Sequence, residues 1–421
     1  MHIRWIILEE YRCILMSIRD NIENSDLESQ VNLWQTRVNF DFFLKNNILL
    51  CCAFLALGFG KFIFYIPLFF VYFFFKLQRF FEIRVDNNFL VVLLLMIAYI
   101  LSIFVIGYDR LMIENRFSWL FVLFFTLVFA GLAMQEESKE LQLKILFFYV
   151  TGIGIDALLI SSYSYWVDSS YYGYGRLLDP YAGIVVNSPI ISNNLAIFSV
   201  ALFLIIFNYK NYYLKIISVL FLGCCVFFGF FLGGRAYFII IAFVLLVFFL
   251  YNLSIKRIVN FFLFLIFIFV FSFVVINYLN LGDGVFKNGL NMLDKGLESN
   301  RFLLYKNGLN LIPAYPFGGF GIDKTIEDVQ SFHNVFLDSA RLAGWLPVFF
   351  LFMAILLISY VSFLSGISKN AVPFIIFITS VLIMQQDVII EGNYRMLMVM
   401  YFSGLVILKK ELIPFENIKF K

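Results

Sequence analysis

One polar interval of the sequence, residues 299–344, holds the side chain best suited to proton transfer. His333 lies in this interval and is one of only two histidines in the chain, the other being His2. Imidazole accepts a proton near neutral pH, so His333 is a candidate general base. The alternative is a polar surface residue that bonds a carbonyl group.

Two carboxylates elsewhere offer other chemistry. Glu391, in VIIEGNYRML, is an alternative base, and Glu391 and Arg395 flank the start of the last apolar segment. The two side chains can pair with each other at helical spacing, or both can complete the site. Asp156, in TGIGIDALLISS, lies inside an apolar segment with no other charge in its helix. A carboxylate within a membrane is costly and often functional, whereas neutral or hydrogen-bonded burial is an equally good interpretation.

Arginines occur in the segments that we expect on the outer side of a membrane, whereas the expected inner loops carry mostly lysine. A guanidinium matches phosphate oxygens with two parallel hydrogen bonds and stays charged, so this contrast suggests phosphate binding. The alternative is that these side chains simply reach the membrane interface. The outer arginines in short loops are Arg110, Arg116, Arg176, Arg235 and Arg395.

Helix termini strengthen the anion-site hypothesis at one of these arginines. FLGGRAYF predicts a turn directly before Arg235, which therefore begins a helix whose free N–H groups attract anions. Near the start of another apolar segment, Asn187, Asn193 and Asn194 can bond a polar ligand, cap the helix or join two helices.

The elements that position these side chains follow from composition. The chain has 421 residues, of which 62% are hydrophobic and 14% charged. Soluble domains carry about a quarter charged residues, and the apolar runs here are continuous rather than alternating. We therefore predict an all-α, polytopic integral membrane protein. The net charge of +3 makes nucleic acid an unexpected partner, and the five cysteines show no metal-site spacing.

The apolar runs predict about twelve transmembrane helices with both termini in the cytoplasm, since every inner loop is then basic. The expected organisation is a cytoplasmic tail (1–45), a bundle of about nine spans (46–279), a large periplasmic loop (280–344), three C-terminal spans (345–408) and a second tail (409–421). The run 48–76 is interpreted as two short spans with a turn at 58–61, or as one crossing. The other spans are expected at 88–107, 118–134, 144–163, 190–208, 213–231, 235–252, 259–279, 345–364, 371–388 and 393–408.

Two short helices are expected within the large loop. Arg301 lies in the first turn of an amphipathic helix that reaches Leu311 and that Pro313 ends. PFGGFG at 316–321 predicts a flexible turn. Ser331 is expected to cap a second helix that carries His333. The apolar face of the first helix is expected to contain Phe302, Leu303, Tyr305, Leu309 and Ile312.

Three segments together resemble the bacterial O-antigen ligase and O-antigen polymerase (Wzy) superfamily. ESNRFLLYKNGLNLIPAYPFGGFGI resembles its arginine, aromatic and proline pattern before a Gly-rich turn. SFHNVFLDSARLAGWLPVFFLF resembles its His-Asn pattern, with ten residues between His333 and Gly344. GGRAYFIIIAFVLL resembles its arginine turn before a span, with Ala236 as a variant, and Tyr305 stands where tryptophan is common.

The resemblance implies a metal-independent glycosyltransferase, without a cofactor, that acts on undecaprenyl-pyrophosphate-linked oligosaccharide at the periplasmic face of the bacterial inner membrane. His333 would activate the acceptor hydroxyl. Glu391 remains the alternative base. The residues that would bind pyrophosphate or substrate are Arg176, Arg235, Arg301, Tyr305, Asn334 and Arg395.

Three functions are weighed. The chain is rich in Phe, Ile, Asn and Lys, which suggests an AT-rich gene of the kind often found in polysaccharide clusters. This bias favours a polymerase that extends the glycan on its lipid carrier. The alternative within the superfamily is a ligase that moves finished glycan to the lipid A core. A glycolipid flippase or transporter is the alternative of another class, disfavoured because the polar residues gather at one face and no internal repeat is visible. Membrane lipid is an expected partner, and a chain-length regulator protein is a further candidate partner.

Overall fold

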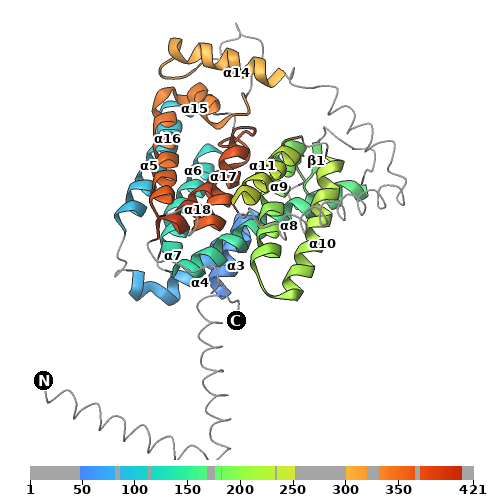
Figure 1. Ribbon diagram of the computed structural model, residues 1–421. Coiled ribbons are helices and arrows are strands. Elements are labelled where there is room, and N and C mark those ends of the chain that lie inside the picture. Colours follow the sequence, from blue (N-terminus) through green and yellow to red (C-terminus); the bar gives the residue numbers. More distant parts are fainter. Residues whose placement is uncertain are drawn as a thin grey trace, which may run out of the picture. The chain divides into compact units, whose positions relative to one another are not determined.

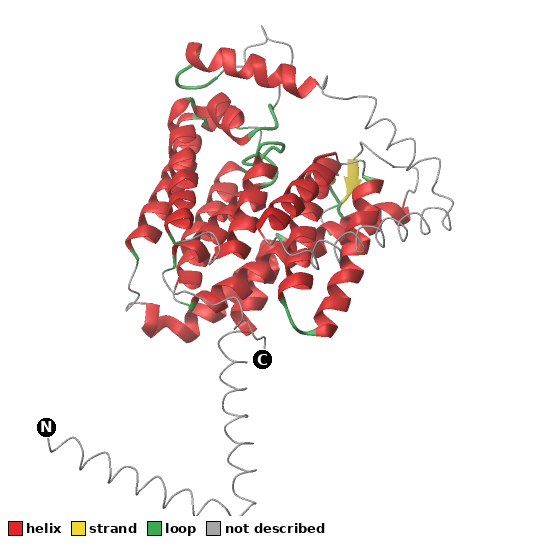
Figure 2. Cartoon of the chain, in the orientation of Figure 1, coloured by secondary structure: helices red, strands yellow, loops and turns green. Residues whose placement is uncertain are grey.

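The structure is a computed structural model, and helices make up most of its described part (Figure 2). It describes residues 48–80, 86–111, 113, 115–135, 137–167, 176–181, 183–232, 235–251, 300–319, 331–365 and 370–409. The chain divides into two compact units, Met1–Leu50 and Cys51–Lys421. Only residues 48–50 of the first unit are described, so the architecture below is that of the second. The predicted span 259–279 and both predicted tails lie outside the described residues, apart from Lys409.

The described helices follow the apolar segments of the sequence (Figure 1). Their bounds are α3 (Leu49–Phe59), α4 (Phe62–Phe80), α5 (Asn87–Ile106), η2 (Tyr108–Arg110), α6 (Arg116–Phe125), the π-helix η3 (Thr126–Ala130), α7 (Gly131–Gln135), α8 (Lys139–Val167), α9 (Ser188–Asn208), α10 (Tyr212–Phe231), α11 (Arg235–Tyr251), α14 (Asn300–Leu311), η4 (Ile312–Ala314), α15 (Val335–Ala343), α16 (Trp345–Leu364), α17 (Ala371–Met384) and α18 (Tyr394–Leu408). One short antiparallel hairpin, β1 (Arg176–Leu178) with β2 (Val185–Asn187), is also present in the otherwise helical described chain.

Six helical segments of the described chain are long and apolar enough to cross a membrane. They comprise α5, α6 together with η3 and α7, α8, α9, most of α10, and α16. The prediction of a helical membrane protein is therefore confirmed in this coarse form. The number of twelve spans and their orientation remain predictions.

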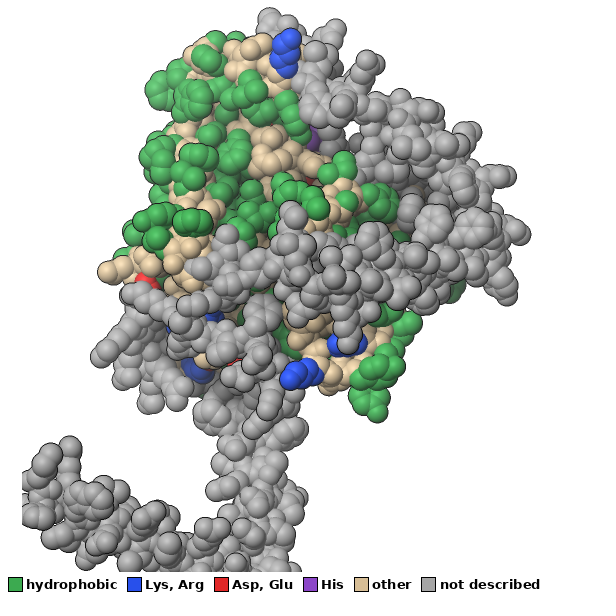
Figure 3. All heavy atoms as spheres, viewed as in Figure 1, with side chains coloured by type: hydrophobic (Ala, Val, Ile, Leu, Met, Phe, Trp, Pro, Cys, Tyr) green, Lys and Arg blue, Asp and Glu red, His purple; other side chains and the backbone are tan. Residues whose placement is uncertain are grey.

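Exposed apolar side chains agree with a lipid environment. Phe74 of α4, Val105 of α5 and Phe363 of α16 are all largely exposed. Figure 3 shows one face on which hydrophobic side chains dominate, while Lys and Arg side chains lie near the top and the bottom of its described part. Water would disfavour such a surface, so we assign it to contact with lipid.

The predicted turn within 48–76 is present between α3 and α4. Gly60 has a φ of 78°, which glycine adopts without the steric cost that a side chain brings. At 11 residues α3 is only about 16 Å long, whereas the hydrocarbon core of a bilayer is about 30 Å thick. Close packing holds α3 on α8, since a Cβ added at Gly58 would lie 2.0 Å from the Tyr149 carbonyl oxygen. The turn is thus confirmed, and two full crossings remain a prediction.

A buried helix, α18, lies at the centre of the bundle. It packs against α17, α8 and α16, and its side chains are buried from Met396 to Leu408. The hydroxyl of Tyr401 donates to the Leu127 carbonyl oxygen over 3.1 Å. Leu127 belongs to the π-helical segment η3, so this bond ties α18 to the irregular turn between α6 and α7. Figure 1 places α14 and α15 at the opposite end of this unit from the α9–α10 connection.

Candidate functional site

The helix that follows His333 is α15, and its first residue is Val335. Asn334 caps it, since its Oδ1 accepts from the backbone N–H groups of Phe336 at 3.0 Å and Leu337 at 3.2 Å. The prediction that Ser331 caps a helix carrying His333 is therefore wrong. Asparagine is among the best N-cap residues, so the helix begins after Asn334 and His333 precedes it.

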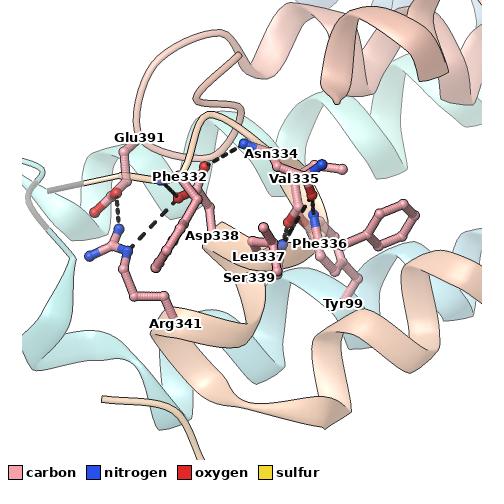
Figure 4. Close-up of polar contacts among 10 residues, drawn as sticks. All are labelled: Tyr99, Phe332, Asn334, Val335, Phe336, Leu337, Asp338, Ser339, Arg341 and Glu391. Atoms are coloured by element: carbon pink, nitrogen blue, oxygen red, sulfur yellow. Dashed lines mark hydrogen bonds and ion pairs between the residues drawn. The ribbon is translucent and has the colours of Figure 1, made fainter. Parts of the chain in front are cut away.

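His333 adopts a left-handed backbone conformation, with a φ of 53°. Such a φ is uncommon for any residue with a Cβ and costs about 1–2 kcal/mol. The two flanking amides are both bound by the carboxylate of Asp338. Phe332 N donates to Oδ1 over 2.7 Å and Asn334 N donates to Oδ2 over 3.1 Å (Figure 4). The side chain of Asp338 therefore holds the turn that presents His333.

Asp338 is buried, and its burial raises the pKa of its carboxyl group to about 6. The two backbone donors and the nearby Arg341 guanidinium act in the opposite direction. Arg341 is fully buried, with its Nε 3.9 Å from Asp338 Oδ1 and its Nη2 2.6 Å from Glu391 Oε2. Figure 4 shows the Arg341 guanidinium joined to the carboxylates of both Glu391 and Asp338.

The predicted pairing of Glu391 with Arg395 is wrong. Glu391 lies in the turn between α17 and α18 and not in a helix, so helical spacing does not apply. It pairs with Arg341 instead, and its side chain is only 8% exposed. Its Oε2 is already occupied by the Arg341 guanidinium, so this geometry favours a structural role for Glu391 over that of a general base.

Helix α14 packs on the His333 turn through one apolar stripe. The hydroxyl of Tyr305 lies 3.2 Å from the His333 carbonyl oxygen and donates to the Gln385 carbonyl oxygen over 2.8 Å. Asn334 Nδ2 also reaches α17, since it donates to Gln385 Oε1 over 3.0 Å. Leu309, which was predicted on the apolar face of this helix, is 61% exposed and lies outside the stripe that packs on the turn. That stripe contains Leu304, Tyr305, Gly308, Leu311 and Ile312, of which Gly308 lies against Phe332.

The Gly-rich turn after α14 is docked by specific bonds and is not a free linker. Arg110 Nη1 donates to the carbonyl oxygens of Phe317 at 2.7 Å and Leu342 at 2.9 Å. Gly344, between α15 and α16, has a φ of 75° and lies against the Pro316 carbonyl oxygen. Arg110 therefore ties two backbone segments together, which neither of its predicted roles anticipated. Its neighbour Arg116 lies over the Tyr108 ring.

Arg395 binds a buried carboxylate. Its Nη1 lies 2.5 Å from Asp156 Oδ2, which confirms hydrogen-bonded burial for Asp156. The guanidinium also lies against Gly60 in the α3–α4 turn. The next residue, Lys61, forms an ion pair with Asp179, which follows β1. Arg395 and Asp156 are thus brought together, although their helices are far apart in sequence.

For the three remaining predicted arginines, the structure describes the position of the backbone. Arg176 begins β1 opposite Asn187, Arg235 is the first residue of α11, as predicted, and Arg301 lies in the first turn of α14, also as predicted. The side chains of these arginines lie outside the described part of the structure. Pyrophosphate binding by Arg176, Arg235 and Arg301 therefore stays a prediction.

Two of the asparagines noted in the sequence connect α9 to the segment between α17 and α18. Asn193 Nδ2 donates to Asp387 Oδ2 over 3.0 Å, and Asn194 Oδ1 accepts from Asn393 Nδ2 over 3.0 Å. Asn187 precedes α9 but makes no side-chain capping bond, so its capping role is wrong. The sequence did not tell which asparagine caps a helix and which bonds another segment, because all three lie before or near the start of the same apolar run.

Sequence reasoning missed Asp338, Arg341 and Gln385. A usable signal was present for two of them, since Asp338 and Arg341 are the charged residues of a short segment, VFLDSARLA, that is otherwise mostly apolar. Charges in such a segment are expected to be paired or functional. Gln385 carries no comparable signal.

Neither metal clusters nor known relatives identify the site. Within the described ranges, no group of three or more His, Cys, Asp or Glu side chains is placed to hold a metal ion. The metal-independent reaction remains a prediction. Comparisons of the chain with protein-family models, curated proteins and solved structures found no match.

Proposed function

We propose that this chain is a membrane glycosyltransferase that moves a glycan from undecaprenyl pyrophosphate to an acceptor lipid-linked repeat unit, as an O-antigen or related surface polysaccharide polymerase. The observation that carries the proposal is the backbone of His333. A non-glycine residue in the left-handed region persists only where its surroundings hold it, and such residues gather at functional sites. Here the Asp338 carboxylate binds both flanking amides.

His333 is the general base in this proposal. The acceptor hydroxyl gives its proton to the imidazole as its oxygen attacks the anomeric carbon of the donor glycan. The bond between that carbon and the pyrophosphate oxygen breaks, and undecaprenyl pyrophosphate leaves with the bonding electron pair. The hydroxyl oxygen ends in the new glycosidic bond, and its proton ends on the imidazole.

Negative charge on the leaving pyrophosphate requires fixed positive charge. Arg235 and Arg301, each at the start of a helix, supply it together with the N–H groups of their helix ends. Arg176, in β1, is a third candidate. Arg395 is less suited to this role than the other three, because Asp156 already compensates its charge.

The experiment is complementation of a deletion strain, with the lipopolysaccharide ladder as the readout. His333→Ala and Arg301→Ala at normal expression should each abolish long chains and leave cores capped by a single repeat unit. Normal ladders from both variants would overturn the proposed site. Arg116→Lys is a matched control, since Arg116 lies over the Tyr108 ring and a lysine keeps its charge. It should leave the ladder intact.

The same experiment separates the competing functions. Uncapped cores, with polymer retained on the lipid carrier, would instead indicate a ligase. A flippase would leave lipid-linked repeats without any turnover when the purified chain is tested in detergent. Synthesis of longer glycans under those conditions, without a gradient, supports the transferase.

A further inference from the structure

Two carboxylates and one guanidinium lie together beside the turn that contains His333. Arg341 and Asp338 are buried, the Glu391 side chain is 8% exposed, and with all three ionised these groups carry a net charge of −1. Burying a charged group costs several kcal/mol, so such groups are retained where they serve a specific arrangement. Arg341 lies closer to Glu391, and the Asp338 carboxylate accepts hydrogen bonds from the two backbone amides around His333.

The distances show how the guanidinium is divided between the two acids. Arg341 Nη2 lies 2.6 Å from Glu391 Oε2, whereas Arg341 Nε lies 3.9 Å from Asp338 Oδ1. Its Nε and Nη1 have no hydrogen-bond partner among the described residues. Glu391 therefore draws the guanidinium away from Asp338, and both Asp338 oxygens remain available to the amides of Phe332 and Asn334.

We infer that Glu391 is a positioning residue, which acts through Arg341 and Asp338 to hold the backbone turn that aims His333 at its substrate. This inference rests on the proposed function, because it assigns a purpose to the turn only if His333 is the base. It goes beyond that function by replacing the role of Glu391 as an alternative base with a role in geometry.

The inference predicts what happens when Glu391 loses its charge. Arg341 is then left without its strongest partner, and the nearest carboxylate is that of Asp338. A guanidinium forms a stronger bond with a carboxylate than a neutral amide does, so Arg341 should recruit Asp338 and withdraw it from the two amides. Without those two bonds, the Asp338 carboxylate no longer offsets the strain at His333, and the imidazole leaves its aligned position.

The test is steady-state kinetics of the purified full chain in detergent. The substrate is the lipid-linked repeat extracted from a strain that lacks this chain. Glu391→Gln and Asp338→Asn should each lower kcat at least tenfold and leave KM within twofold. Because both act on one turn, the double variant should be no slower than Asp338→Asn alone. If instead the two substitutions lower kcat independently, so that the fold-loss in the double variant is the product of the two single losses, the inference is overturned.

Ser339→Ala provides the matched control on the same helix. Its hydroxyl contacts Tyr99 of α5 at 2.9 Å and donates to the Val335 carbonyl oxygen over 2.6 Å (Figure 4). Unlike the Asp338 carboxylate, it does not bind the amides of Phe332 and Asn334. Loss of a buried hydrogen bond there should lower thermal stability and leave kcat within twofold. A tenfold fall in kcat for this variant would mean that any damage to α15 slows the enzyme, and the specific role of Glu391 would be refuted.

A pH profile adds a readout that a merely structural role would not change. Besides His333 in the adjoining turn, the titratable or charged groups around Asp338 are Arg341 on its own helix, Glu391 in the α17–α18 turn and Tyr99 of α5. Protonation of Asp338 and of His333 should each stop turnover on the acid side, so the logarithm of kcat should fall with a slope near two. In Asp338→Asn the slope should fall to one.

The outcomes separate this inference from the proposed function. If His333→Ala keeps wild-type kcat, the proposed function fails and the inference with it. If His333→Ala is inactive while Glu391→Gln and Asp338→Asn turn over normally, the function stands and the positioning role is wrong. Should Glu391→Gln fail to accumulate, the slope of the Asp338→Asn profile decides, since a slope that stays near two contradicts the role of Asp338.

Discussion

Arg395, the second residue of α18, forms an ion pair with Asp156, which lies within α8, 239 positions earlier in the chain. The Nη1–Oδ2 distance is 2.5 Å, and the carboxylate is fully buried. A charge within an apolar helix is costly unless a partner compensates it, so each residue makes burial of the other tolerable. The pair therefore fixes the buried helix α18 against α8.

Removing one member of this pair should destabilise the protein strongly. Asp156→Asn leaves an uncompensated guanidinium, and the free energy of unfolding should fall by about 3–5 kcal/mol. Thermal unfolding in detergent measures the change. The double variant Asp156→Leu with Arg395→Met removes both charges and should recover most of the stability, and failure to recover would contradict the pairing. Asp109→Asn, at an exposed side chain 4.0 Å from Arg116, is the control and should change nothing measurable.

Gly344 should tolerate no side chain. A Cβ added there would lie 1.9 Å from the Pro316 carbonyl oxygen, and the φ of 75° is itself unfavourable for alanine. Gly344→Ala should therefore displace the Gly-rich turn from the α15–α16 junction and abolish stable expression. Gly183→Ala is the matched control, since its φ is 62° but no atom lies within 4 Å. It should cost only about 1 kcal/mol, from backbone strain alone.

The N-cap of α15 should contribute measurably to stability. Asn334→Ala removes the acceptor for two backbone N–H groups and should cost about 1 kcal/mol, within the usual range for caps. Asn334→Asp keeps the capping oxygen but loses the bond to Gln385 Oε1. If thermal unfolding finds alanine and aspartate equally destabilising, the contact with α17 and not the cap is what matters.

Asp338 should make stability depend on pH in a definite direction. Its pKa in the folded protein is about 6, above its usual value of about 3.9, so the folded state holds this proton more tightly than the unfolded state. This tighter proton binding stabilises the folded state by roughly 3 kcal/mol. The contribution is fully present below about pH 4 and is lost as the pH rises through about 6. Relative to Asp338→Asn, the wild type should lose stability between pH 4 and 7. A difference that stays constant over this range would contradict the raised pKa.

Hydropathy predicted the helices well, because burial in lipid demands long apolar segments whatever their neighbours are. The prediction 190–208 became α9, Ser188–Asn208, and 88–107 became α5, Asn87–Ile106. The extent of α14 was also readable, since a helix expected to carry Arg301 in its first turn and to end before Pro313 spans Asn300–Leu311. The β1–β2 hairpin was not predicted, because its strands have only three residues each and carry little pattern.

The candidate site was predictable only in part. His333 and Asn334 stand out by residue type, and their neighbourhood was correctly expected to contain two short helices. Local rules did not decide between Ser331 and Asn334 as the cap of the second helix. The role of Asp338 as acceptor for two amides depends on the left-handed turn at His333. No residue spacing in the sequence predicts that turn.

Composition alone decides that this chain is built from apolar helices, because nearly two thirds of its residues are hydrophobic and few are charged. Which charges meet is decided by the packing of helices that are distant in sequence. Glu391 lies four residues before Arg395, yet it pairs with Arg341, while Arg395 pairs with Asp156. The physical reason is that a buried charge takes whichever partner the tertiary structure brings within hydrogen-bond distance, and sequence spacing controls that distance only within a single helix.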